Sequence, residues 1–202
     1  FRSADKVYGD TEALILELRL KLKDGSEQVI ASDLSWKAQR SKIRFANIYD
    51  GEIYDATFSD DTLYPVKAMD LGFDRLTPRL SPPVIITEKI TPKEIIKTPK
   101  GETVLDLGQE ITGWLAFKTR APKGTKLHLS YGEILQGGNF YRDNLRSAKA
   151  EYTYISDGTE REVRPYFTYF GFRYIKLEGF GEGIQLSDFT GCVVHSTLHQ
   201  IG

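Results

Sequence analysis

The chain has 202 residues, of which 40% are hydrophobic and 12% aromatic, which is enough to bury one large core or two smaller ones. Its 27 basic and 28 acidic residues leave a net charge of -1 at pH 7, so no field attracts nucleic acid or an anionic membrane surface. We therefore expect no nucleic-acid partner and no membrane partner. No apolar run reaches the ~18 residues of a membrane span and no N-terminal signal is present, which predicts a soluble protein and leaves its compartment open.

The sequence offers little for cofactor or metal chemistry. Cys192, the single cysteine, lies in an apolar strand-like run, where a buried and inert thiol is favoured over a reactive one. His195 and His199 are four residues apart in a predicted strand, which separates them by about 13 Å and argues against a zinc site. We find no Gly-rich phosphate loop, no acidic calcium loop and no serine nucleophile motif. The expectation is therefore no cofactor and no metal.

Near the N-terminus, leucines alternate with mostly charged residues over positions 14–23, the period-2 pattern of a strand with one apolar face. Asp24 and Gly25 follow, and both residue types tolerate the positive φ of a type I′ turn. Residues 27–30 then return as the partner strand. This stretch predicts a β-hairpin.

Proline-containing signals cluster between Leu76 and Ser81 and predict an extended connector. We therefore predict two domains, residues 1–78 and 79–202. Short apolar runs separated by turn signals, with no sustained helical period, predict an all-β fold made of two β-sandwich modules. The first module is expected to be incomplete, because about 75 residues give only a few strands and the chain, which starts at Phe1 rather than at Met, begins within a pattern.

Residues 101–180 hold a dense strand pattern and most of the aromatic residues. Their distinctive segments, in chain order, are Asp106-Leu107-Gly108-Gln109, Gly113-Trp114, Tyr131-Gly132-Glu133, Asn144-Leu145-Arg146-Ser147-Ala148 and Pro165-Tyr166-Phe167-Thr168-Tyr169-Phe170-Gly171-Phe172-Arg173-Tyr174. Taken in this order, they resemble the β-sandwich module beside the catalytic barrel of bacterial α-L-rhamnosidases. Upstream, residues 33–37 and 48–56 resemble the end of the jelly-roll module that precedes it in the same enzymes.

This resemblance implies that the chain is the accessory β-sandwich portion of an inverting glycoside hydrolase that acts on terminal α-L-rhamnosides. It implies a catalytic (α/α) barrel of the same polypeptide as partner, and rhamnose-containing glycans as ligands. Because both catalytic carboxylates would belong to that barrel, we assign no catalytic residue here and expect the chain alone to be inactive. The alternative is a free-standing carbohydrate-binding or surface adhesion module.

One polar loop, residues 139–148, combines side chains of the kinds that bind sugars. Aromatic rings stack on saccharides, while amides, carboxylates and guanidinium groups bind the hydroxyls. The candidate sugar-binding or barrel-contacting residues are Tyr141, Arg142, Asp143, Asn144 and Arg146, with Trp114 as a further candidate. We expect the loop to face the barrel near its active-site mouth.

Each candidate also has a structural interpretation. The loop can instead be an ordered segment docked on a neighbouring module, with Arg146 in a salt bridge and Tyr141 as a packing anchor. Trp114 follows Gly113 in an apolar strand, where a core position is favoured over an exposed sugar platform. For Asp106 and Glu133, at or beside strand ends, we predict structural hydrogen bonds.

Overall fold

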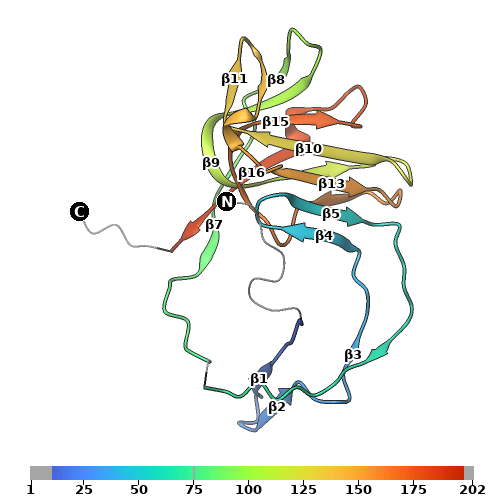
Figure 1. The fold of residues 1–202 in the computed structure, drawn as a ribbon, viewed down its shortest axis with the longest axis vertical. Coiled ribbons are helices and arrows are strands. Elements are labelled where there is room, and N and C mark those ends of the chain that lie inside the picture. The colour runs from blue at the N-terminus through green and yellow to red at the C-terminus, as the bar shows by residue number, and fades with distance from the viewer. Residues whose placement is uncertain (1–10, 75, 198–202) are drawn as a thin grey trace, which may run out of the picture. The chain divides into compact units, whose positions relative to one another are not determined.

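The computed structural model describes residues 11–74 and 76–197 (Figure 1). Contacts divide the chain into two compact units. Unit 1 comprises residues 1–41 and 60–78, and unit 2 comprises residues 42–59 and 79–202. Among the described residues, the regular elements other than strands are two short 3-10 turns, η1 (Asp143–Leu145) and η2 (Leu186–Asp188), so the predicted all-β class is confirmed. No helix in these ranges is long and apolar enough to cross a membrane.

Unit 1 contains the predicted hairpin. β1 (Glu17–Lys21) pairs antiparallel with β2 (Glu27–Ala31), and β3 (Lys37–Ala38) pairs with β6 (Tyr64–Pro65). The hairpin loop differs from the predicted type I′ turn, because only Gly25 has a positive φ, of 84°, and its N–H donates to the carbonyl of Leu22. This is the three-residue loop in which a glycine follows the turn as a bulge.

The apolar face of this hairpin has no cover among the described residues. Leu18 and Ile30 are paired across the two strands, and they remain 46% and 40% exposed. A two-stranded sheet with an open apolar face is at best marginally stable. That the first module is incomplete stays a prediction.

Unit 2 is built around one curled ten-stranded sheet. Its main path runs β4 (Ile43–Asn47), β5 (Gly51–Asp55), β13 (Glu151–Ile155), β10 (Lys126–Gly132), β15 (Phe170–Glu178), β9 (Thr103–Thr119), β16 (Phe189–Ser196) and β7 (Val84–Ile90). β8 (Glu94–Lys97) and β14 (Arg161–Val163) each add to β9, and a separate hairpin joins β11 (Ile134–Gln136) to β12 (Asn139–Tyr141). The long strand β9 thus connects most parts of the unit.

The segment of residues 42–59 groups with unit 2 by its contacts. We placed it in the first domain, but β5 pairs parallel with β13, and Gly51 sits opposite Glu151. A Cβ on Gly51, whose φ is 113°, would lie 1.7 Å from the Glu151 carbonyl oxygen, so the close approach needs glycine. Contacts therefore assign this hairpin to unit 2, while the division of the family's modules at residue 78 stays a prediction.

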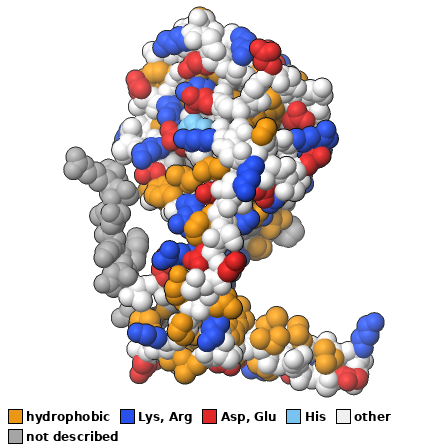
Figure 2. Space-filling model, turned by 90° about the vertical axis from the view of Figure 1, so that its right-hand side faces the viewer, with side chains coloured by type: hydrophobic (Ala, Val, Ile, Leu, Met, Phe, Trp, Pro, Cys, Tyr) orange, Lys and Arg blue, Asp and Glu red, His pale blue; other side chains and the backbone are white. Residues whose placement is uncertain are grey.

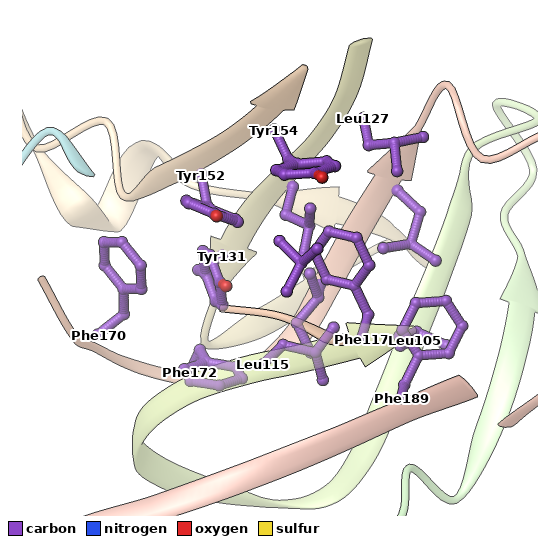
Figure 3. Close-up of a cluster of buried hydrophobic side chains, with 14 of the residues drawn as sticks. Leu105, Leu115, Phe117, Leu127, Tyr131, Tyr152, Tyr154, Phe170, Phe172 and Phe189 are labelled. Atoms are coloured by element: carbon purple, nitrogen blue, oxygen red, sulfur yellow. The ribbon is translucent and has the colours of Figure 1, made fainter. Parts of the chain in front are cut away.

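The core of unit 2 lies between the two parts of the curled sheet (Figure 3). β10 and β13 supply tyrosines and leucines from one side, and β9 and β16 supply Phe117 and Phe189 from the other. The largest fully buried side chains are Tyr131, Tyr152, Tyr154, Phe117, Phe172, Phe189, Leu105, Leu115, Leu127, Leu129, Ile175 and Glu52. All but one are apolar or aromatic. The exception, Glu52, belongs to the candidate site.

The place of residues 42–59 can be tested by limited proteolysis. Arg40, Lys67 and Arg79 are exposed and lie in unit 1 or at its borders. We expect trypsin to cut there first, and residues 41–67 to stay bound to residues 80–202 in native gel filtration because of the β5–β13 pairing. They should separate only in denaturant. Elution of residues 41–67 as a separate, late-eluting free peptide in the absence of denaturant would contradict the division.

Candidate functional site

The sequence motifs meet in pairs within unit 2. Asp106 from β9 and Arg173 from β15 form a two-pronged ion pair, with Nε to Oδ1 and Nη2 to Oδ2 both at 2.8 Å. Oδ1 also accepts the N–H of Gly108 at 2.7 Å. The carboxylate is buried, and its hydrogen bonds to Arg173 lower the pKa of Asp106 below its usual range. The structural role predicted for Asp106 is confirmed.

The loop of residues 139–148 is held by acidic side chains of the neighbouring strands. Asn144 donates from Nδ2 to Oε2 of Glu133 at 2.7 Å, which confirms the structural bond predicted for Glu133. Arg142 donates from Nη2 to Oε1 of Glu151 at 2.9 Å and from Nη1 to the Lys149 carbonyl oxygen. Two of the candidate side chains are therefore occupied by bonds within unit 2.

Arg146 differs from the salt-bridge role considered for it. Its side chain is exposed and forms no ion pair with a described residue, whereas the loop's salt bridge belongs to Arg142. Arg142 directly follows β12 and reaches Glu151 at the start of β13, while Arg146 follows η1. Its backbone has φ 58° and ψ −111°, a conformation that costs an L-residue about 1–3 kcal/mol. The salt bridge of this loop is therefore made by Arg142, and Arg146 is exposed on a strained backbone.

The other candidates are placed differently. Tyr141 is half-buried at the end of β12, opposite Ile134, and Asp143 is exposed at the start of η1. Trp114 lies in β9 opposite Cys192, half-buried, with the Arg164 guanidinium 5.4 Å from its ring centre. It is covered by that arginine rather than presented as an open sugar platform. The structure brings the loop candidates together and leaves Trp114 apart.

A second exposed feature lies beside the loop. We call it the aromatic ridge, made of Ile48, Tyr49, Tyr166, Phe167 and Tyr169, which are 49%, 60%, 54%, 68% and 50% exposed. The Thr168 hydroxyl donates to the Ile48 carbonyl oxygen at 3.4 Å and joins the two segments. The Ala150 N–H donates to the Tyr49 carbonyl oxygen at 3.0 Å and ties the ridge to the loop. Exposed apolar clusters of this kind commonly mark interaction surfaces.

The buried side chain of Glu52 binds the backbone of the aromatic ridge. Oε2 accepts the N–H groups of Tyr166 and Phe167 at 3.0 and 2.8 Å, while the side chain is 2% exposed. Oε1 has no hydrogen-bond partner among the described residues. Burial raises the pKa of Glu52 above its ordinary value, with the two backbone bonds and Arg164 opposing that shift. The carboxylate therefore fixes the backbone that carries two ridge side chains.

The surface formed by the loop and the ridge combines aromatic rings with polar and charged side chains. Glu110 has its pKa raised by burial and by repulsion from Glu133, but Glu133 is bonded to Asn144. Within the described ranges, no three His, Cys, Asp or Glu side chains are grouped to hold a metal ion. Acidic and basic side chains are interspersed over the face of unit 2 that Figure 2 shows, without one dominant sign. The surface presents aromatic rings, polar loop groups and the exposed guanidinium of Arg146, which forms no ion pair with a described residue.

Sequence reasoning missed two contributors to this surface. Glu52 is one of them, because nothing near it in the sequence shows that it becomes buried under the segment of residues 164–169, more than 110 positions away. The available signal for the ridge was the aromatic run from Tyr166 to Tyr174, whose rings cannot all face one core.

Known proteins match this chain along nearly its whole length. Residues 1–88 match the model of the alpha-L-rhamnosidase N-terminal domain, and residues 96–195 match that of the bacterial alpha-L-rhamnosidase concanavalin-like domain. An alpha-L-rhamnosidase of Streptomyces avermitilis is 31% identical over 94% of this chain and 20% of its own length.

Solved structures agree. The alpha-L-rhamnosidase of Aspergillus terreus superposes with a TM-score of 0.86 at 32% identity, covering 94% of this chain and 23% of that one. The enzyme from Dictyoglumus thermophilum gives 0.84 at 31% identity, covering 97% and 24%. This chain spans about a fifth of the length of the curated relatives that it matches. The chain belongs to the α-L-rhamnosidase family, within which it corresponds to the N-terminal domain followed by the concanavalin-like domain.

Proposed function

We propose that this accessory portion serves an α-L-rhamnosidase that hydrolyses terminal α-L-rhamnosides, and that it docks on a catalytic (α/α) barrel of the same polypeptide. The docking surface is the loop of residues 139–148 together with the aromatic ridge. In this role the chain supplies a rigid wall beside the substrate, and the barrel supplies the chemistry. Rhamnose-containing glycans are then the ligands of the assembled enzyme.

One observation carries this proposal: hydrogen bonds join the segments that carry two exposed features of different chemistry. The N–H of Lys149, the residue directly after the loop, donates to Oδ1 of Asp50 at 3.4 Å, in the same segment that carries Ile48 and Tyr49. Interfaces typically combine an apolar or aromatic centre with polar and arginine contacts around it. Loops held on a rigid β scaffold are common places for binding residues.

The division of labour predicts that the purified chain does not hydrolyse an aryl α-L-rhamnoside. Glycoside hydrolysis needs two carboxyl groups placed across the scissile bond, and Glu52, Glu133 and Glu151 at this surface are engaged in structural bonds. Release of the chromogenic phenol should not exceed that from buffer. Turnover that disappears when an Asp or Glu of this chain is replaced would overturn the proposal.

Replacing Arg146 separates a docking role from a structural one. In the chain alone, Arg146→Gly should raise the free energy of unfolding by about 1 kcal/mol, because glycine adopts the positive φ without strain. In a full-length enzyme carrying this region, the same change should raise the Michaelis constant or weaken the contact between domains, by roughly 1–3 kcal/mol if a charge-assisted bond is lost. Urea unfolding and steady-state kinetics give the two readouts.

The matched variants are Arg146→Ala and Arg146→Lys. Alanine removes the guanidinium and keeps the backbone strain, so it should impair the enzyme without stabilising the chain. Lysine keeps the charge and should fall between wild type and alanine if the bond is charge-assisted. Wild-type kinetics and domain contact in all three variants would show that Arg146 is only a solvated surface residue.

A further inference from the structure

A groove lies on unit 2 among the turns that join its strands, lined by residues that the docking surface does not use. Its volume is about 540 Å³. The groove is lined by Lys118 and Arg120 at the end of β9, by Glu160 in the turn before β14, and by Phe180 and Glu182 in the segment after β15. This volume falls in the range of sites for small organic ligands.

The floor of the groove is a fixed aromatic ring. Phe180 packs edge-on against Phe117, with ring centres 5.2 Å apart, and against Phe189 at 5.7 Å. Leu127, which is buried, adds to the base. A ring that is already locked by its neighbours loses little freedom when a ligand stacks on it. The floor can therefore accept the C–H face of a sugar ring.

The rim carries a planar pair of hydrogen-bonding groups. Arg120 donates from Nη2 to Oε1 of Glu160 at 3.0 Å, and its Nε lies 3.0 Å from Oε2. The two side chains are 81% and 61% exposed, so their remaining N–H groups and lone pairs face water. A guanidinium and a carboxylate held side by side offer donors and acceptors in the spacing that adjacent hydroxyls require.

The charges of the groove select for a neutral ligand. Lys118 and Arg120 face three acidic residues, Glu160, Glu182 and Asp188, so the lining carries charges of both signs. Oδ2 of Asp188 is already used, because it accepts the N–H of Gln185 in the box that starts η2. A strongly anionic or cationic ligand would therefore meet repulsion from one half of the lining.

From the locked ring, the exposed planar pair and the charges of both signs, we infer that this groove is a second site, which binds a neutral saccharide. It does not depend on a catalytic barrel, since all of its lining belongs to unit 2. In a rhamnosidase it would hold part of a glycan. The choice of a rhamnose-containing probe rests on the proposed function, whereas the site itself does not.

The test is a titration of the full chain with a neutral rhamnosyl-glucose disaccharide, followed by ¹⁵N–¹H correlation spectra. We expect saturable shifts confined to residues 118–121 and 180–185, with a dissociation constant in the millimolar range. Arg120→Ala and Glu160→Gln, both on exposed side chains, should each weaken binding at least fivefold without changing the rest of the spectrum. Lys97→Ala, on β8, is the matched control and should bind like wild type.

Two further probes make the outcome decisive. Maltose should bind if the groove accepts neutral saccharides in general, and binding of maltose alone would uphold the groove while counting against rhamnose as its sugar. Glucose 6-phosphate should bind more weakly than either. Absence of saturable shifts with both disaccharides, shifts that survive Arg120→Ala, or tighter binding of the phosphate would each overturn the inference.

Discussion

Replacing Asp106 by alanine is expected to lower the free energy of unfolding of the chain by roughly 2–4 kcal/mol at pH 7. The change removes both bonds to Arg173 and leaves the Gly108 N–H without its acceptor. It also leaves a guanidinium whose side chain is only 35% exposed without its counter-charge. The pair joins β9 to β15 where their register shifts between Phe172 and Tyr174, so the loss falls on the centre of the sheet.

The effect of Asp106 should depend on pH in a definite direction. Its pKa is lowered in the folded chain, chiefly by the Arg173 bonds, so its stabilisation is present above the unfolded value of about 3.9. It is lost as the pH falls through the folded value.

Urea unfolding at pH 7, 5 and 3.5 should show the difference between wild type and Asp106→Asn shrinking below about pH 4. Glu88→Ala, on an exposed position of β7, is the control and should change stability by less than about 0.5 kcal/mol at pH 7. A pH-independent difference would contradict the ion pair.

Glu52 should behave in the opposite way. Glu52→Gln keeps an oxygen that can accept the Tyr166 and Phe167 N–H groups and removes a buried charge, so we expect stability at pH 7 equal to or about 1 kcal/mol above wild type. Glu52→Ala removes the acceptor and leaves a cavity, so a loss of roughly 2–4 kcal/mol is expected. The alanine variant should also loosen the ridge, seen as faster hydrogen exchange over residues 164–169.

The raised pKa of Glu52 fixes the sign of its pH dependence. A carboxyl group that titrates higher in the folded state than in the unfolded state favours folding most below the unfolded value, about 4.3, and loses that advantage as the pH rises through the folded value. The stability gain of Glu52→Gln over wild type should therefore grow from pH 4 upward. If the stability difference between Glu52→Gln and wild type instead falls as the pH rises, the folded protein favours the ionised form of Glu52 and the raised pKa is contradicted.

The sequence was informative where structure is local or periodic. Alternating leucines predicted the β1–β2 hairpin, and the ordered motifs identified strands whose Asp106 and Glu133 make structural bonds. Contacts between segments far apart in the chain could not be predicted, because no local sequence pattern indicates them. The parallel contact of β5 with β13 spans about a hundred residues, and so does the burial of Glu52 beneath residues 164–169. The loop's salt bridge is formed by Arg142 and not by Arg146, because the 3-10 turn η1 lies between these two arginines and separates their side chains. A turn of three residues cannot be located from composition alone.

Docking through the loop and the ridge is tested most directly by hydrogen exchange. Amides of residues 139–148 and 164–169 would be followed in this chain alone and in a full-length rhamnosidase polypeptide that contains it. Docking predicts slower exchange of both segments in the full-length protein, with the buried strands β10 and β13 exchanging alike in the two. Equal exchange of the two segments in both proteins would contradict the proposed docking surface.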